Sequence, residues 1–165
     1  MRWIFKFALV LIFVGCATNS PTVSKNSIES IDESKVAGLW YELAFIDSSQ
    51  NEFDEIRSNY LYKNKTLFIT KELSKKNPPF TKTEHFSAKQ FGKKGSPLFV
   101  GESFSGRYEI VKVDPFYQYA LIFGKNKLWI ISRKKSIPEV IKVVFLNHAK
   151  MHGYDNSKIT WLNWN

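Results

Sequence analysis

The chain is poor in the residues from which disulfide-rich, nucleotide-binding and many hydrolytic proteins are built. Its 165 residues include one cysteine and eight glycines. A single cysteine excludes a framework of internal disulfides. The glycines form neither a G-x-S-x-G nucleophile elbow nor a glycine-rich phosphate loop. No apolar run approaches the roughly 18 residues that a membrane-spanning helix requires.

Histidine is also scarce, with three residues in the chain. His148 and His152 are four residues apart, the spacing of two metal ligands on a helix, but the glutamate of the H-E-x-x-H motif is missing. His85 stands alone, and the acidic pair Asp54 and Glu55 falls in a polar stretch typical of a solvated loop. We therefore expect no metal, no cofactor and no enzymatic activity.

Aromatic residues and positive charge are abundant. Phe, Tyr and Trp make up 16% of the chain, and the net charge is +9. Aromatic side chains favour strands and fill barrel interiors. The lysines occur as scattered pairs beside turns, which favours solvated loops over attraction to an anionic membrane surface. Nucleic acid is the weakest interpretation, because no stripe or known nucleic-acid motif is present.

The N-terminal segment has the pattern of a secretory signal. Arg2 and Lys6 precede a short apolar run at residues 7–14, and Gly15-Cys16 follows. Phe13-Val14-Gly15-Cys16 resembles the lipobox of bacterial lipoproteins. That resemblance implies cleavage before Cys16 and lipid attachment to it. It also implies outer-membrane sorting, since Ala17 is not an aspartate. The alternative is an ordinary signal peptide with a coincidental cysteine.

These features divide the chain into three parts. Residues 1–15 are the expected signal peptide, and residues 16–32, rich in Ser, Thr and Asn, are an expected flexible tether. Residues 33–165 are the expected folded domain. Removal of residues 1–15, which carry two basic side chains and no acidic one, lowers the net charge from +9 to +7.

The folded part consists of short apolar-alternating runs separated by turn signals such as Lys63-Asn64-Lys65 and Gly124-Lys125-Asn126-Lys127. This pattern predicts an all-β fold, an eight-stranded antiparallel up-and-down barrel. The polar stretch from Asp47 to Asp54 is an expected loop over the open end. The expected strands are at about 39–46, 57–63, 66–73, 82–91, 97–104, 107–114, 118–123 and 127–132.

One segment has helical periodicity. Ser136-Ile137-Pro138-Glu139 has the spacing of a capping box, and Gly153 provides a stop after about His152. A short strand from Ile159 to Trp164 is expected to follow the helix. The face expected to pack outside the barrel comprises Ile137, Ile141, Phe145 and His148. A second apolar set suggests a homodimer contact or a membrane-facing patch, and comprises Val140, Val143, Val144 and Met151.

Gly38-Leu39-Trp40 opens the first expected strand, and Arg133 follows the last. A guanidinium stacked on an indole contributes about 0.5–2 kcal/mol. We expect Trp40 and Arg133 to meet at one end of the barrel and close it. A barrel of this size that is closed at one end is a cup for one small ligand. The alternative is an ordinary core tryptophan and an ordinary surface arginine.

Three motifs occur in the order found in lipocalins. Gly38-Leu39-Trp40-Tyr41-Glu42, the segment 114–119 and the segment 128–133 resemble the first, second and third lipocalin motifs. With its lipobox, the chain is similar to the bacterial outer-membrane lipoprotein lipocalins related to apolipoprotein D. This resemblance covers about residues 33–164. It implies a lipid-anchored protein of the outer membrane that binds, stores or transports fatty acids, lysophospholipids or similar ligands.

Side-chain alternation predicts the wall of the cup, or calyx. Lys71 has the parity of an inward residue, and Glu42 is a candidate partner for it. A position at the rim in water is the favoured interpretation for Lys71, because an unpaired buried charge is costly. The residues expected to line the calyx are Tyr60, Tyr62, Leu67, Ile69, Tyr108, Ile110, Trp129 and Ile131.

Two other functions remain open at this point. The first is a structural envelope lipoprotein whose barrel is filled by its own side chains. The second, less favoured, is an enzyme that acts on a lipophilic substrate inside the calyx. An enzyme would need a nucleophile and a base pointing inward, and no such pair is evident.

Overall fold

A computed structural model describes residues 31–90, 97–101 and 104–164. The expected signal peptide, Cys16 and nearly all of the tether lie outside the described residues. Ile31 is 6% exposed and belongs to the main core. The Asp32 side chain accepts a hydrogen bond from the Ser34 amide and caps the short helix α1 (Glu33–Val36). Ile31 and Asp32, at the end of the expected tether, therefore pack with the folded domain.

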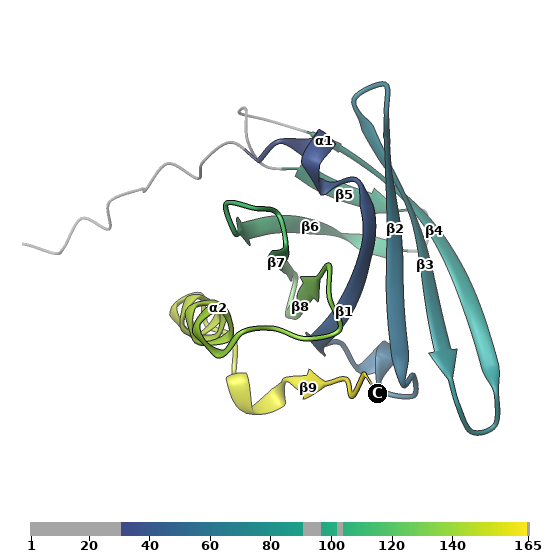
Figure 1. Ribbon diagram of the computed structural model, residues 1–165, viewed down its shortest axis with the longest axis vertical. Helices are drawn as coiled ribbons and strands as arrows, with labels where there is room; N and C mark the ends of the chain where they lie inside the picture. Colours follow the sequence, from purple (N-terminus) through teal and green to yellow (C-terminus); the bar gives the residue numbers. More distant parts are fainter. Residues whose placement is uncertain (1–30, 91–96, 102–103, 165) are drawn as a thin grey trace, which may run out of the picture.

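The domain is built on one antiparallel sheet (Figure 1). Each of the first eight strands pairs with its neighbour in sequence, and β1 pairs with both β2 and β8, so the order of strands returns to its start. The expected all-β barrel of eight strands is confirmed. The strands are β1 (Gly38–Ile46), β2 (Glu55–Lys63), β3 (Thr66–Lys75), β4 (Phe80–Gln90), β5 (Pro97–Gly101), β6 (Phe104–Val113), β7 (Tyr119–Gly124) and β8 (Lys127–Ser132).

Alternation along the strands separates an inner face from an outer one. On the β2–β3 pair, Tyr60 lies opposite Ile69 and both are buried, whereas the next pair, Leu61 and Phe68, is largely exposed. This period of two follows from the pleat of the strand. It fixes which side chains of each strand enter the barrel.

Strand β1 departs from strict alternation. Its pairing with β8 shifts between Glu42 and Ala44, which is the signature of a β-bulge. Trp40 and Phe45 are five residues apart, yet both are fully buried in the same inner core. The extra residue restores the inward direction after Glu42.

Helix α2 (Glu139–Met151) lies outside the barrel beside β7 and β8 (Figure 1), as expected. Phe145 and Ala149 are buried in a second core with Leu121 and Ile130 of those strands. The expected capping box is wrong: the N-cap is Pro138, and no side chain caps the helix. Proline at this position fixes φ and leaves Ser136 one turn outside the helix.

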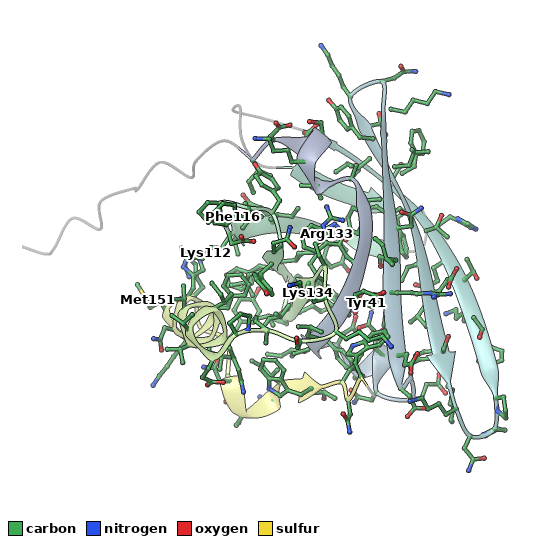
Figure 2. All side chains as sticks on the ribbon, in the orientation of Figure 1. Tyr41, Lys112, Phe116, Arg133, Lys134 and Met151 are labelled. Atoms are coloured by element: carbon green, nitrogen blue, oxygen red, sulfur yellow. The ribbon has the colours of Figure 1, made fainter. Side chains whose placement is uncertain are left out.

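Of the other expected members of the packing face, Ile137 and Ile141 are partly buried against this second core, and His148 stacks on its Phe123. The outer apolar set stays exposed, and Figure 2 shows Met151 on the side of α2 away from the sheet. After α2, the turn η2 (Asn156–Lys158) leads to β9 (Thr160–Trp161), which pairs with β1. This strand is shorter than expected. Within residues 31–90, 97–101 and 104–164, no helix is long and apolar enough to cross a membrane.

Acidification should weaken the contact between α2 and the barrel. His148 stacks on Phe123 with ring centroids 5.9 Å apart. Burial, then the neighbouring His152 and Lys112, lower the pKa of His148 below its ordinary value of 6.5. The unfolded chain therefore takes up the proton at higher pH than the folded chain. The contribution of neutral His148 to the stability of the fold is thus complete above about pH 6.5 and is lost as pH falls.

We expect a smaller loss of stability between pH 7 and pH 5 in His148→Gln than in the unsubstituted chain. Urea unfolding followed by tryptophan fluorescence measures the difference. The control is His85→Gln, on the exposed face of β4. If the free energy of unfolding depends equally on pH in the unsubstituted chain and in His148→Gln, protonation of His148 does not weaken the fold.

Candidate functional site

One end of the barrel is closed by Trp40 and Arg133. The guanidinium carbon of Arg133 lies 3.8 Å from the centroid of the Trp40 ring, and the Trp40 indole donates to the Val36 carbonyl at 2.7 Å. Figure 2 shows Arg133 inside the fold below α1. The guanidinium also donates to four carbonyl oxygens of α1 and the start of β1, at 2.7–3.1 Å, those of Lys35, Val36, Ala37 and Leu39.

Gly38 is required by this arrangement. Its φ is +105°, a conformation that L side chains rarely adopt, and a Cβ there would lie 2.9 Å from Arg133 Nη1. The glycine thus permits both the turn from α1 into β1 and the close approach of the guanidinium. This gives the G-x-W spacing a physical reason.

The second motif supports the same end of the barrel. Asp114 Oδ1 accepts hydrogen bonds from the amides of Gln118 and Tyr119, each at 2.6 Å, and so fixes the β6–β7 turn. The Tyr117 carbonyl accepts from Arg133 Nε at 3.3 Å, and its hydroxyl accepts from the Asp32 amide at 2.8 Å. The three sequence motifs therefore meet in one hydrogen-bonded floor.

An open cavity lies inside the barrel above this floor. It holds about 540 Å³ of empty space, including the part that opens to solvent. Its wall is mostly aromatic and aliphatic. The lining residues come from β1–β4 and β6–β8 and are Glu42, Ser58, Tyr60, Ile69, Lys71, Phe86, Tyr108, Ile122, Trp129 and Ile131.

Five of the eight expected wall residues line this cavity: Tyr60, Ile69, Tyr108, Trp129 and Ile131. The other three have the expected inward direction but do not line it. Leu67 and Ile110 are buried in the inner core, and Tyr62 is partly buried against it.

Five lining residues are outside the expected wall set: the charged residues Glu42 and Lys71, and Ser58, Phe86 and Ile122. Strand parity indicates the last three. Ser58 is two residues before Tyr60 on β2. Phe86 lies opposite Ile69 in the β3–β4 pairing, and Ile122 lies opposite Trp129 in the β7–β8 pairing. Cross-strand partners share a face of the sheet, so correct registers would have predicted all three.

A buried ion pair crosses the wall. Lys71 Nζ lies 2.6 Å from Glu42 Oε1, and the two side chains are 7% and 6% exposed. The favoured position of Lys71 at the rim in water is therefore wrong, and Glu42 is its partner. Burial raises the pKa of Glu42, while Lys71 opposes that shift. The pair can remain buried because each charge neutralises the other.

Two tyrosines of the wall are also affected by burial. Burial, and then the negative charge of Glu42, raise the pKa of Tyr60 above its ordinary value. Burial, and then Asp47, raise the pKa of Tyr108 to about 12. Both phenols therefore remain protonated at neutral pH.

The loop after β1 packs over the opposite end of the barrel from α1. It forms the turn η1 (Ser48–Gln50), blue at the bottom of Figure 1. Gln50 is 2% exposed, and its Oε1 accepts from the Trp129 indole at 3.2 Å. Asp47 pairs with Lys127 at 3.0 Å. These contacts anchor the loop beside the cavity.

The described part of the chain holds no group of three or more His, Cys, Asp or Glu residues that could bind a metal ion. His148 of α2 and His152, the C-cap residue of that helix, have ring centroids 4.4 Å apart. Their position outside the barrel separates them from the cavity.

A β-barrel that is closed at one end and has an aromatic cavity above the closure defines the calyx class of proteins. The family model described as the lipocalin-like domain matches residues 31–163, and the chain belongs to that family.

The chain is similar to named proteins in both sequence and structure. It is 25% identical to the outer membrane lipoprotein Blc of Citrobacter freundii, over 92% of this chain and 89% of that protein. Lobster apocrustacyanin A1 has a similar fold, with a TM-score of 0.67 at 14% identity over 80% of this chain and 79% of that one. Insecticyanin of the tobacco hornworm Manduca sexta has a TM-score of 0.64 at 17% identity, over 84% of this chain and 83% of that one.

Arg133→Ala should destabilise the domain by about 1–3 kcal/mol, because it removes the stacking on Trp40 and the bonds to α1. Chemical denaturation measures the change. The matched control is Arg57→Ala, whose exposed guanidinium pairs with Glu72 at 2.6 Å and should contribute at most about 1 kcal/mol. Equal effects of the two substitutions would contradict a special role for Arg133.

Proposed function

We propose that this protein is a lipid-anchored lipocalin of the outer membrane that binds small hydrophobic or amphiphilic ligands in its calyx. The observation that carries the proposal is the aromatic cavity above the Trp40–Arg133 floor. Binding, storage or transport needs such a cavity, whereas a purely structural barrel would be filled by its own side chains. Membership of the lipocalin-like family supports the same function.

The calyx wall we propose comprises the five expected residues on the cavity together with Phe86 and Ile122. Single-chain amphiphiles, including fatty acids and lysophospholipids, are the ligands that suit an aromatic wall. Burial of about ten methylene groups contributes roughly 8 kcal/mol before the lost freedom of the ligand is counted. A low-micromolar affinity corresponds to a net free energy of about 8 kcal/mol, so contacts with the aromatic wall have to offset the lost freedom of the ligand.

The proposed location depends on Cys16 and on the relatives. The lipobox-like segment supports lipid attachment, and the similar proteins of Citrobacter freundii and of Escherichia coli (strain K12) are both named outer membrane lipoprotein Blc. Two or more acyl chains anchor a protein stably, whereas one chain binds only reversibly. A homodimer through Val140, Val143, Val144 and Met151 stays a prediction.

Ligand binding is tested by titrating the unacylated chain from Ala17 onward with a lysophospholipid and a fatty acid. We expect saturable quenching or enhancement of tryptophan fluorescence, with dissociation constants in the low-micromolar range or below. The signal should be reduced in Trp129→Phe, since Trp129 lines the cavity. Phe116→Leu, at an exposed turn, is the control. Absence of saturable binding would favour the structural envelope lipoprotein.

Lipid attachment is tested on the protein recovered from bacterial envelopes. We expect mass spectrometry to find an N-terminal peptide that begins at Cys16 and carries three acyl chains, and fractionation to place the protein in the outer membrane. Cys16→Ser should release the protein from the membrane. Cleavage at another residue, or an unmodified Cys16, would contradict the anchor.

A further inference from the structure

The cavity wall contains a polar atom that the fold leaves without a partner. Glu42 Oε1 binds Lys71, but Glu42 Oε2 is buried and accepts no hydrogen bond. Glu33 and Asn156 also have such an oxygen among the described residues, but of the three only Glu42 lines the cavity. An unsatisfied buried acceptor is costly, more so when it is charged. A ligand that supplies a donor there would remove that cost.

The surroundings of Glu42 limit what that ligand can be. Lys71 is already bound to Oε1, and its Nζ lies 6.0 Å from the Trp129 ring centroid. Ser58 is opposite Lys71 in the β2–β3 pairing and is the third member of this polar belt. Trp40 lies in the floor on one side of the belt, and Trp129 lies toward η1 on the other. The belt is thus inside the calyx rather than at its rim.

We propose, on the basis of the proposed function, that the calyx selects single-chain amphiphiles whose polar group carries a hydrogen-bond donor, and that this donor binds Glu42 Oε2. Suitable groups are the hydroxyl of an alcohol or a glycerol ester. An ionised carboxylate has only acceptors, and it would face the Glu42 carboxylate, whose countercharge Lys71 is already engaged. Ionised fatty acids are therefore the weaker ligands of this site.

The experiment compares three ligands of equal chain length on the unacylated chain from Ala17 onward. These are 1-decanol, its methyl ether and decanoate, measured by isothermal titration calorimetry at about pH 8, where a carboxylic acid is ionised. The ether keeps the chain and the oxygen but lacks the donor. We expect decanol to bind at least about tenfold more tightly than either of the others, because one hydrogen bond to a charged acceptor contributes that much to affinity.

Substitutions identify the acceptor. Glu42→Gln leaves Lys71 buried without its countercharge and can prevent folding. Glu42→Leu combined with Lys71→Met replaces the whole pair by apolar side chains of similar size, an exchange that folded proteins often tolerate. We expect this double variant to bind the ether at least as well as before and to lose the tenfold preference for decanol.

The control removes an exposed ion pair between β2 and β3, the second of which also carries Lys71. Arg57→Gln combined with Glu72→Gln breaks an exposed pair and should keep the preference for decanol. Equal affinity of the unsubstituted chain for decanol and its ether, or a preference that survives in the Glu42/Lys71 variant, would overturn the inference while leaving the proposed function intact. Failure of all three ligands to bind would overturn both.

Discussion

The contact between Arg133 and the α1–β1 segment is the interaction on which the rest of the structure depends. Arg133 follows the last barrel strand, and its guanidinium stacks on Trp40 of the first strand at 3.8 Å. The same group donates hydrogen bonds to carbonyl oxygens of α1, of Ala37 and of Leu39 in β1. One side chain thus ties together the two ends of the barrel sequence and closes the floor. The strand pairing of β1 with β2 and β8 closes the barrel, and the Arg133 contacts close one end of it.

The interior above that floor combines two opposed requirements. Aromatic and aliphatic side chains make the cavity suitable for hydrocarbon, whose transfer from water is favourable. The Glu42–Lys71 pair places two charges in the same wall, and a buried pair is weak support for stability because desolvation offsets its attraction. Folded proteins often tolerate apolar side chains of similar volume in place of such a pair. The pair is therefore better explained by ligand selection than by folding.

The sequence alone predicts much of this architecture, because side chains alternate between the two faces along most of each strand. It places Tyr60, Ile69 and Trp129 on the inner face, and the G-x-W segment together with Arg133 indicates the closed end. The sequence does not predict features that depend on contacts between distant segments. Lys71 is buried because its Nζ reaches the Glu42 carboxylate of β1, on the far side of β2, and the position of Phe86 depends on the β3–β4 register. The helix start at Pro138 shows that a capping-box spacing alone does not decide where a helix begins.

The bulge in β1 connects these observations. Without the extra residue after Glu42, strict alternation would turn either Glu42 or Phe45 outward, since the two are three residues apart. With it, Trp40, Glu42 and Phe45 all enter the barrel, and one strand supplies part of the floor, an ion-pair partner and a core residue. Bulges redirect side chains in this way near functional sites. The acceptor on Glu42 is thus held by the backbone of a paired strand rather than by a loop, and a rigid acceptor distinguishes ligands with a donor from those without one more sharply than a mobile acceptor does.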